Sequence, residues 1–226
     1  MTDQLKWARF HLGAGADSTA VLSTQARADM QTPKVTLRGS APGDAIGHSW
    51  FIHTVDGVTY ASHGGTTNGQ YSELLLVPAH NFALVSNTNT GPSGIQLNQE
   101  LLKWALEEYL NVHEQPPQLA VLQEHELRKY LGTFETGAAY VIVDVSAGEL
   151  TLDFHVKEDA LAELGGAGPE YPTFGLAMLA DGEDEYVFTS GPVVGIRGFF
   201  ERDAAGEISG VDVTGRVYAR TVAEVR

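Results

Sequence analysis

Residues 49–88 read SWFIHTVDGVTYASHGGTTNGQYSELLLVPAHNFALVSNT and carry the clearest strand pattern in the first half of the chain. Asp56-Gly57 is a strong signal for a two-residue hairpin between two apolar runs. Leu74–Val77 is continuously apolar, which indicates a well-buried strand. We therefore predict an antiparallel meander, whose four strands are expected at residues 49–55, 58–62, 71–77 and 82–87.

Helical patterns flank this meander. Residues 2–12 predict a short amphipathic helix with Thr2 or Asp3 as its N-cap, and Ser18–Met30 predicts a second short helix. Gln96–Asn111 is the clearest helix, because its apolar residues form a broad stripe. We expect this stripe to pack on the meander.

The second half of the chain has a different pattern. Adjacent prolines at 116 and 117 cannot continue a helix, so we predict domains at 1–112 and 123–226 joined by a linker at 113–122. Short strands at regular spacing after the linker predict a small barrel or sandwich. These strands are expected at residues 139–145, 149–154, 185–189, 198–202, 208–213 and 216–221. The fold class is therefore α+β.

Composition excludes several function classes. A formal net charge of -15 argues against nucleic acid or an anionic membrane as partner, because phosphate binding needs clustered Lys and Arg. The absence of cysteine excludes disulfides, thiolate metal sites and Cys nucleophiles. The histidines are scattered without metal-ligand spacing, so we predict no metal site and no cofactor, and solvated or core-edge histidines. No signal peptide or membrane span is expected, and the compartment stays open.

His63-Gly64-Gly65 is the motif that points to chemistry. Glycines let backbone N–H groups approach a ligand closely, and a polar side chain beside them contacts a bound carboxylate or carbonyl. On these residues alone, a glycine-rich strand end with an exposed histidine is an equally good interpretation.

A wider set of residues resembles the second half of the serine β-lactamase-related family, which includes class C β-lactamases, D-aminopeptidases, D-peptidases and related esterases. The resemblance covers about residues 1–112. It rests on residues 5–10, 30–33, 47–52 and 87–89, and on His63-Gly64-Gly65. The last of these is similar to the His-x-Gly motif that stands in D-aminopeptidase-like members where other members carry Lys-Thr-Gly.

The resemblance implies roles for matching positions. His63 would face the substrate or support the acid–base network, and Gly64 and Gly65 would admit the substrate backbone along the strand edge. The backbone N–H of Thr66 would be an oxyanion donor. His63, Gly65 and Thr66 are thus the candidate catalytic residues, and Gly64 is the candidate substrate-binding residue.

The chain departs from this family at the nucleophile. No serine in the sequence has a lysine three residues later, so the Ser-x-x-Lys motif is absent. Acyl transfer needs nucleophile, base and oxyanion donors as one unit. We therefore expect the chain to be the C-terminal fragment of a serine hydrolase that acts on peptides, amides or esters, and to be inactive alone. The alternative is a non-catalytic binding or oligomerisation module centred on the barrel.

The second half resembles the lipocalin-like domain appended to D-aminopeptidase-type members. This likeness rests mainly on Tyr130-Leu131-Gly132-Thr133-Phe134 and on the strand spacing. In the first half, strands missing from the sheet would leave an edge and apolar surface uncovered, and such edges tend to be paired. We therefore expect self-association, or partnering with an N-terminal fragment.

Overall fold

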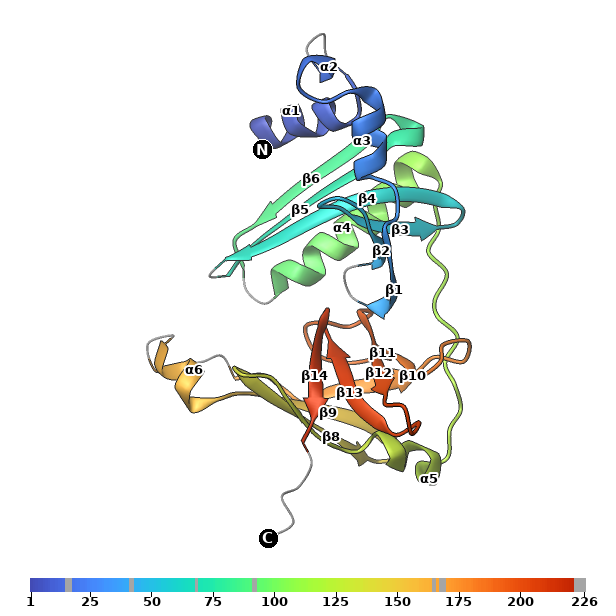
Figure 1. The fold of residues 1–226 in the computed structure, drawn as a ribbon, viewed down its shortest axis with the longest axis vertical. Helices are drawn as coiled ribbons and strands as arrows, with labels where there is room; N and C mark the ends of the chain where they lie inside the picture. Colours follow the sequence, from blue (N-terminus) through green and yellow to red (C-terminus); the bar gives the residue numbers. More distant parts are fainter. Residues whose placement is uncertain are drawn as a thin grey trace. The chain divides into compact units, whose positions relative to one another are not determined.

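The computed structural model describes residues 1–14, 18–40, 43–67, 69–90, 93–163, 166 and 170–221. The chain divides into two compact units, Met1–Leu37 with Pro42–Pro116 and Arg38–Ala41 with Pro117–Arg226. The first holds an antiparallel sheet with helices and the second a closed antiparallel barrel (Figure 1), which confirms the predicted α+β fold class.

The first unit is built on a six-stranded sheet whose strands follow chain order. They are β1 (Val35–Ser40), β2 (Gly43–Ile46), β3 (Phe51–Val55), β4 (Val58–Thr67), β5 (Gln70–Val77) and β6 (Phe82–Thr88). The predicted meander is β3 to β6, joined by the expected turn at Asp56-Gly57. The short strands β1 and β2 were not predicted.

Strand β4 is longer than the sequence pattern predicted. It was expected to end at Ser62, which would place His63-Gly64-Gly65 at a strand end. Pairing with β5 instead continues through Gly64↔Glu73 to Thr67↔Gln70. The expectation was wrong because glycine lowers strand propensity without preventing ladder hydrogen bonds. The motif therefore lies inside a strand.

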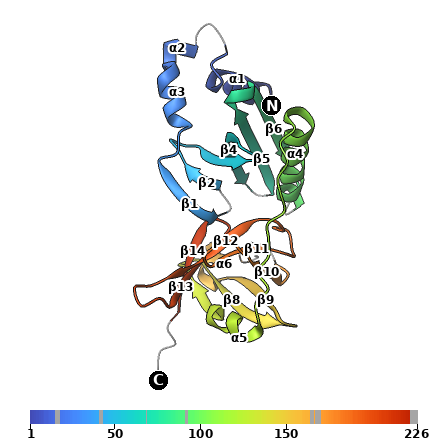
Figure 2. The ribbon, with the colours of Figure 1, turned by 90° about the vertical axis from the view of Figure 1, so that its right-hand side faces the viewer.

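Helices α1 (Thr2–His11) and α4 (Ser93–Leu110) pack on opposite faces of β5 and β6 (Figure 2). Successive strand residues point to opposite faces. Leu74 and Leu76 accordingly join a cluster with Ala8 of α1, whereas Leu75 and Val77 join one with Leu106 of α4. This two-sided burial explains the continuous apolar run of β5. It also confirms that α4, the helix predicted at residues 96–111, packs on the meander.

Two helix predictions need correction. Residues 18–30 form two helices, α2 (Ser18–Val21) and α3 (Thr24–Met30), because the Ser23 hydroxyl accepts a 3.0 Å hydrogen bond from the Ala26 N–H and starts a new helix. At the start of the chain the N-cap of α1 is Met1, without a side-chain cap. Neither Thr2 nor Asp3 takes that role.

The second unit is a closed barrel rather than a sandwich. Around the barrel the strands are β10 (Phe174–Met178), β11 (Glu185–Phe188), β12 (Arg197–Arg202), β13 (Ile208–Val213), β14 (Arg216–Arg220), β7 (Gly132–Glu135), β8 (Ala139–Ser146) and β9 (Glu149–Val156). The six predicted strands are present, and β7, β10 and the short helix α6 (Glu158–Glu163) were not predicted. Buried rings of Phe134, Tyr186, Phe188 and Phe200 occupy the interior, which suits an eight-stranded barrel filled by side chains.

The barrel unit contains an ion pair with a buried carboxylate. An acidic run such as Glu183-Asp184-Glu185 usually lies in solvent, but Asp184 is buried. Its carboxylate accepts hydrogen bonds from the Tyr130 hydroxyl at 2.7 Å and from Arg202 Nε at 2.6 Å. Burial acts to raise the pKa of Asp184, but these hydrogen bonds outweigh it and lower that pKa. Asp184 is therefore a structural anion.

The packing of β5 gives a first testable prediction. Leu76→Ala should destabilise the first unit by about 2–5 kcal/mol, because the side chain is 0% exposed and truncation leaves a cavity. Leu97→Ala on α4 is the control, since Leu97 is 52% exposed, and should change stability by less than about 0.5 kcal/mol. Urea unfolding followed by tryptophan fluorescence isolates this unit, because Trp7, Trp50 and Trp104 all belong to it. Equal losses in both variants would contradict the two-sided packing.

Candidate functional site

His63 projects from the middle of β4 on the face covered by α1. It pairs with Leu74 across the sheet, and Leu74 lies in the α1-side cluster. The His63 ring is exposed and stacks on Phe51 with ring centroids 5.4 Å apart. The strand thus presents the imidazole on an open surface that has an aromatic support.

A cavity of about 310 Å³ adjoins this histidine. Its volume is at the lower end for small-molecule sites. His63 and Gly64 line it, together with Gln4, Trp7, His11, Met30, Ser49, Trp50, Ser72 and Leu74. The structure therefore brings two of the four candidate residues to one cavity. Gly65 and Thr66 continue along β4 as exposed residues outside this lining, paired with Ser72 and Tyr71.

The cavity wall contains a buried histidine that sequence reasoning misjudged. His11 is 3% exposed, between the rings of Trp7, Phe10 and Trp50. Burial, and then the charge of Arg27, lower the pKa of His11, so the ring is neutral near pH 7. Among the described residues, neither ring nitrogen of His11 nor the Trp50 indole N–H has a hydrogen-bond partner. Only the i, i+4 spacing of Trp7 and His11 on one helix face hinted at this placement.

The opposite face of β4 carries a second polar group of side chains. His53 Nε2 lies 3.1 Å from Ser62 Oγ. Burial raises the pKa of the half-buried Glu73 carboxyl to about 7, and the nearby Ser62 hydroxyl opposes that rise. Burial likewise lowers the pKa of His53, partly offset by Asp44.

Gly64 has a structural reason to be glycine. A Cβ there would lie 2.7 Å from Glu73 Oε2 and 3.1 Å from the Ser72 carbonyl oxygen. At Gly65 the nearest atom to a Cβ would be Ser72 Oγ at 3.3 Å. The space that Gly64 leaves open is therefore the space that the Glu73 carboxyl needs. The use of the same space by a substrate stays a prediction.

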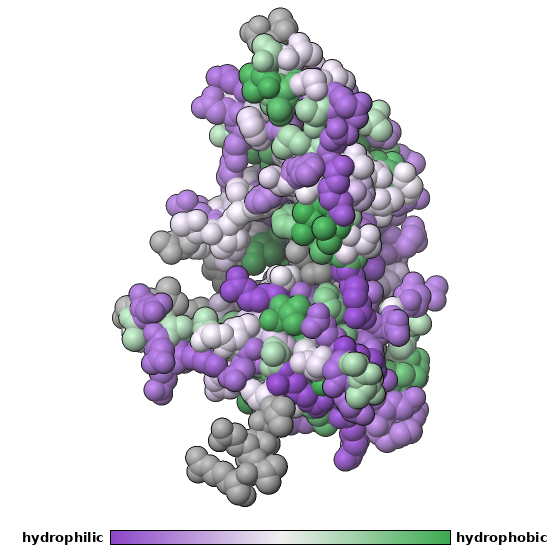
Figure 3. Space-filling model, viewed as in Figure 1, coloured by the Kyte–Doolittle hydropathy of each residue, from purple (hydrophilic) through white to green (hydrophobic). Residues whose placement is uncertain are grey.

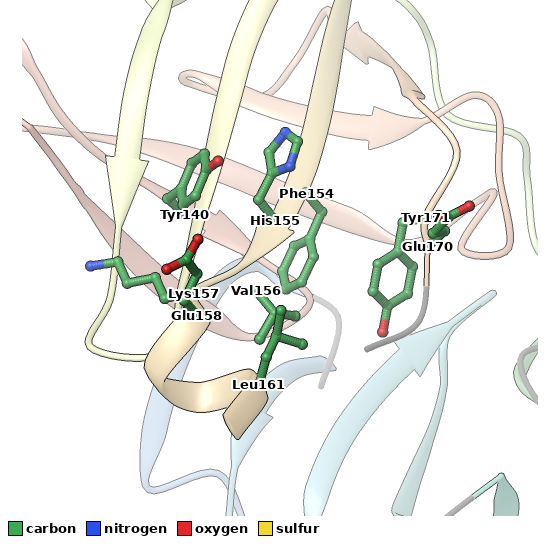
Figure 4. Close-up of a pocket in the computed structure, with 9 residues that line it drawn as sticks. All are labelled: Tyr140, Phe154, His155, Val156, Lys157, Glu158, Leu161, Glu170 and Tyr171. Carbon is green, nitrogen blue, oxygen red and sulfur yellow. The ribbon is translucent and has the colours of Figure 1, made fainter. Parts of the chain in front are cut away.

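The barrel unit has a larger cavity, of about 760 Å³, where β8 and β9 meet α6. Its rings form pairs, Tyr140 with His155 at 4.7 Å and Phe154 with Tyr171 at 5.1 Å. Its charged groups do not converge: Lys157 pairs with Glu135 at 2.6 Å, and Figure 4 shows Lys157 and Glu170 directed away from the Phe154 ring. The cavity offers aromatic surface without a set of catalytic groups.

Within the described part of the chain, no three His, Asp or Glu side chains come together as metal ligands. None of the helices described is both long and apolar enough to cross a membrane.

Comparison with known proteins places this geometry in a context. No family model matches the chain. The chain is 34% identical over 93 residues to penicillin-binding protein 4 of Amycolatopsis lactamdurans, a match that covers 39% of this chain and 24% of that protein.

Solved structures extend the comparison to the whole fold. The crystal structure of SurE with D-Leu matches with a TM-score of 0.62 and 23% identity, over 97% of this chain and 49% of that one. A second crystal structure of SurE matches with a TM-score of 0.61 and 25% identity, over 97% of this chain and 48% of that one. The chain thus spans about half of each SurE chain.

These findings show similarity at a coarse level. Part of the chain is similar in sequence to a penicillin-binding protein, and the chain shares its fold with SurE, which supports a relation to the penicillin-binding-protein and β-lactamase-related group. The sheet with His63 on β4 and the appended barrel are consistent with that relation.

The two glycines beside His63 give a matched pair of variants. Gly64→Ala should destabilise the first unit by about 1–3 kcal/mol, because the added methyl would lie 2.7 Å from Glu73 Oε2 and 3.1 Å from the Ser72 carbonyl oxygen, so that these groups must shift. Gly65→Ala should change stability by less than about 1 kcal/mol, since its Cβ meets one movable hydroxyl. Urea unfolding compares them, and equal effects would contradict the role given to Glu73.

Proposed function

We propose that this chain is the C-terminal fragment of a serine hydrolase of the β-lactamase, D-peptidase or esterase type, and that it is inactive alone. One observation carries the proposal: His63 and Gly64 line a cavity on β4 in a chain similar to a penicillin-binding protein. The chain covers only 24% of that relative, so the activity belongs to a longer protein.

In this proposal β4 forms one wall of the site. The substrate backbone runs along Gly64 and Gly65, and the Thr66 N–H donates to the developing oxyanion, where a fixed donor contributes most. His63 holds the substrate or supports proton transfer. The nucleophile comes from a Ser-x-x-Lys segment outside this sequence.

The substrate class follows from the cavity and one relative. Trp7, Met30, Trp50 and Leu74 give the cavity an apolar surface, which suits a hydrophobic side chain. SurE was crystallised with D-Leu. We extend this to the present chain as a peptide, amide or ester substrate with an apolar D-configured residue. A D-peptide is thereby favoured over a β-lactam.

Association is the second part of the proposal. The sheet ends in β1 and β6, and Leu5, Trp7 and Val35 are exposed large hydrophobic side chains of the first unit. Figure 3 shows hydrophobic residues in small patches among hydrophilic ones. Open sheet edges with apolar side chains beside them are features that a partner can cover. The partner is a second copy of this chain or the N-terminal fragment.

A non-catalytic binding or oligomerisation module remains the alternative. The aromatic cavity of the barrel favours it, since Tyr140, Phe154 and Tyr171 offer a surface for a ligand or a partner. Under this alternative His63 is an exposed strand residue without chemistry. The two functions differ in whether an upstream segment completes a catalytic site.

Activity assays separate these functions. The isolated chain should neither turn over nitrocefin or a D-alanyl p-nitroanilide nor react with a fluorophosphonate, because it has no activated serine. A longer reading frame with upstream Ser-x-x-Lys should do so, and His63→Ala in that protein should lower kcat/KM by about 10²-fold, as loss of one acid–base or oxyanion group does. Labelling of the isolated chain, or full activity of the His63→Ala protein, would overturn the proposal.

Association is tested by sedimentation velocity at micromolar concentration. The isolated chain should sediment as a dimer or larger species, and the double variant Leu5→Ser with Val35→Ser should shift it toward monomer, because both side chains are exposed apolar groups. Val121→Ser, an exposed valine of the barrel unit, is the control. A monomer at all concentrations contradicts self-association.

A further inference from the structure

Helix α1 forms one wall of the cavity beside His63 and is packed on β5 and β6 by few buried side chains. Gln4, Trp7 and His11 are its residues that line the cavity. Ala8 and His11 are the buried residues among its ten. We propose that α1 is an acid-released wall: protonation of the buried His11 frees the helix from the sheet and opens the cavity. The inference rests on the proposed function, because it describes the regulation of that site.

The place of His11 in the fold suits a neutral ring and not a charged one. The imidazole is 3% exposed and makes T-shaped contacts with Trp7 and Trp50, with ring centroids 4.5 Å and 5.1 Å apart. Among the described residues, neither of its nitrogens has a hydrogen-bond partner. A neutral imidazole leaves one N–H unpaired here, whereas an imidazolium would leave two together with a full charge. The docked helix therefore disfavours the protonated form.

A buried cation adds to this penalty. Burial lowers the pKa of His11 below its ordinary value of 6.5, and the positive charge of Arg27 on α3 lowers it further. Arg27 is itself buried, so water screens its charge poorly. His11 also lies in the last turn of α1, where the helix dipole favours a cation, but burial and Arg27 outweigh that effect.

No carboxylate compensates for these effects within the described residues. Asp3 of α1 and Asp29 of α3 are exposed and are bonded to neighbours on their own helices. Trp50 and Leu74, which the sheet side contributes to the cavity wall, are uncharged, and His63 is the other titratable side chain that lines it. A proton on His11 is therefore stabilised only by contact with water.

The other contacts of α1 are too few to hold the helix by themselves. Ala8 adds a small apolar side chain to the cluster that contains Trp50. Gln4 exchanges hydrogen bonds with Asn87 of β6 at 2.7 Å and 3.4 Å, and these lie in solvent. None of the ion pairs between described residues joins α1 to the sheet. Because short helices are marginal in water without tertiary packing, α1 depends on the neutral ring of His11.

Linkage gives the sign of the pH dependence. Docked His11 has a lowered pKa, whereas a solvated His11 has the ordinary value of 6.5. Docking is therefore fully favourable above pH 6.5, and below it the undocked helix binds a proton that the docked helix does not. The docking equilibrium should weaken by up to about tenfold for each pH unit below 6.5, until the pH reaches the lowered pKa.

Release of α1 would dismantle the site without moving β4. Trp7 leaves with the helix, and with it part of the apolar surface that we assign to the side chain of the substrate. His63 and Gly64 stay in place, because pairing between β4 and β5 holds them. Acid thus removes substrate binding before it affects the strand that carries the candidate catalytic residues.

The test uses the absence of cysteine from the chain. A single thiol is introduced as Ala8→Cys on α1 or as Ala105→Cys on α4, since both alanines are buried and lie on opposite faces of the sheet. Its rate of alkylation is measured in the isolated chain between roughly pH 5.5 and 8, and is divided by the rate for the same chain in urea. This ratio removes the pH dependence of the thiolate itself.

The two thiols should respond differently. The relative rate for Ala8→Cys should be constant above pH 6.5 and rise by up to about tenfold per pH unit below it. The rate for Ala105→Cys should stay flat. This control is needed because burial also lowers the pKa of His53, on the opposite face, and acid unfolding of the whole unit would expose both thiols.

Two histidine variants assign the effect. His11→Phe keeps an aromatic ring without a proton site, and it should remove the acid dependence of the Ala8→Cys thiol. His80→Gln, at an exposed histidine of the same unit, should leave that dependence unchanged.

A flat rate for Ala8→Cys across the pH range overturns the inference, and so does an acid dependence that survives His11→Phe. Parallel rises at both thiols contradict a local release of α1. If His11→Phe does not fold, the two thiols in the otherwise unchanged chain decide the case, together with an NMR titration of His11, whose midpoint must lie below 6.5. No activity is measured, so failure here is distinct from failure of the proposed function.

Discussion

The register between β4 and β5 is the constraint on which the rest of the structure depends. Because side chains alternate across a strand, a one-residue slip would move every side chain of β4 to the other face. His63 would then lie under α4, and Ser62 with Gly64 would face α1. The register is held by Leu74 and Leu76 on one side and Leu75 and Val77 on the other, all buried against helices. Apolar packing of β5 thus decides which polar groups of β4 meet the cavity.

The two faces of β4 carry polar groups in very different states. On the α1 face, His63 is exposed beside a cavity, where solvent or ligand satisfies it. On the α4 face, Ser62 is buried and its Oγ lies 3.1 Å from His53 Nε2, and Glu73 is half-buried. Loss of a partner from a buried hydrogen bond costs more than loss of one at the surface. The α4 face therefore constrains its polar side chains more than the exposed α1 face does.

Sequence patterns predicted the elements well where burial is one-sided or continuous. The run at Leu74–Val77, the hairpin at Asp56-Gly57 and the stripe of α4 all correspond to what the structure contains. Patterns failed where a local hydrogen bond decides the outcome, as at Ser23, whose cap splits one predicted helix into two. They also did not indicate that His11 and Asp184 are buried. Their burial depends on residues distant in sequence, such as Trp50 for His11 and Arg202 for Asp184, and local periodicity carries no information about these partners.

Gly64 shows how a motif residue acquires two explanations. Position 64 is the variable position of His-x-Gly, and the family resemblance assigns it to the passage of substrate. In this chain its missing side chain makes room for a carboxyl on the far side of the sheet. The two explanations are compatible, because the missing side chain leaves space on the Glu73 side while Gly64 also lines the cavity beside His63. A Cβ at 64 would meet closer contacts than one at 65, where the nearest atom is a hydroxyl at 3.3 Å. Glu73 is therefore a reason for glycine at 64 that does not depend on any ligand.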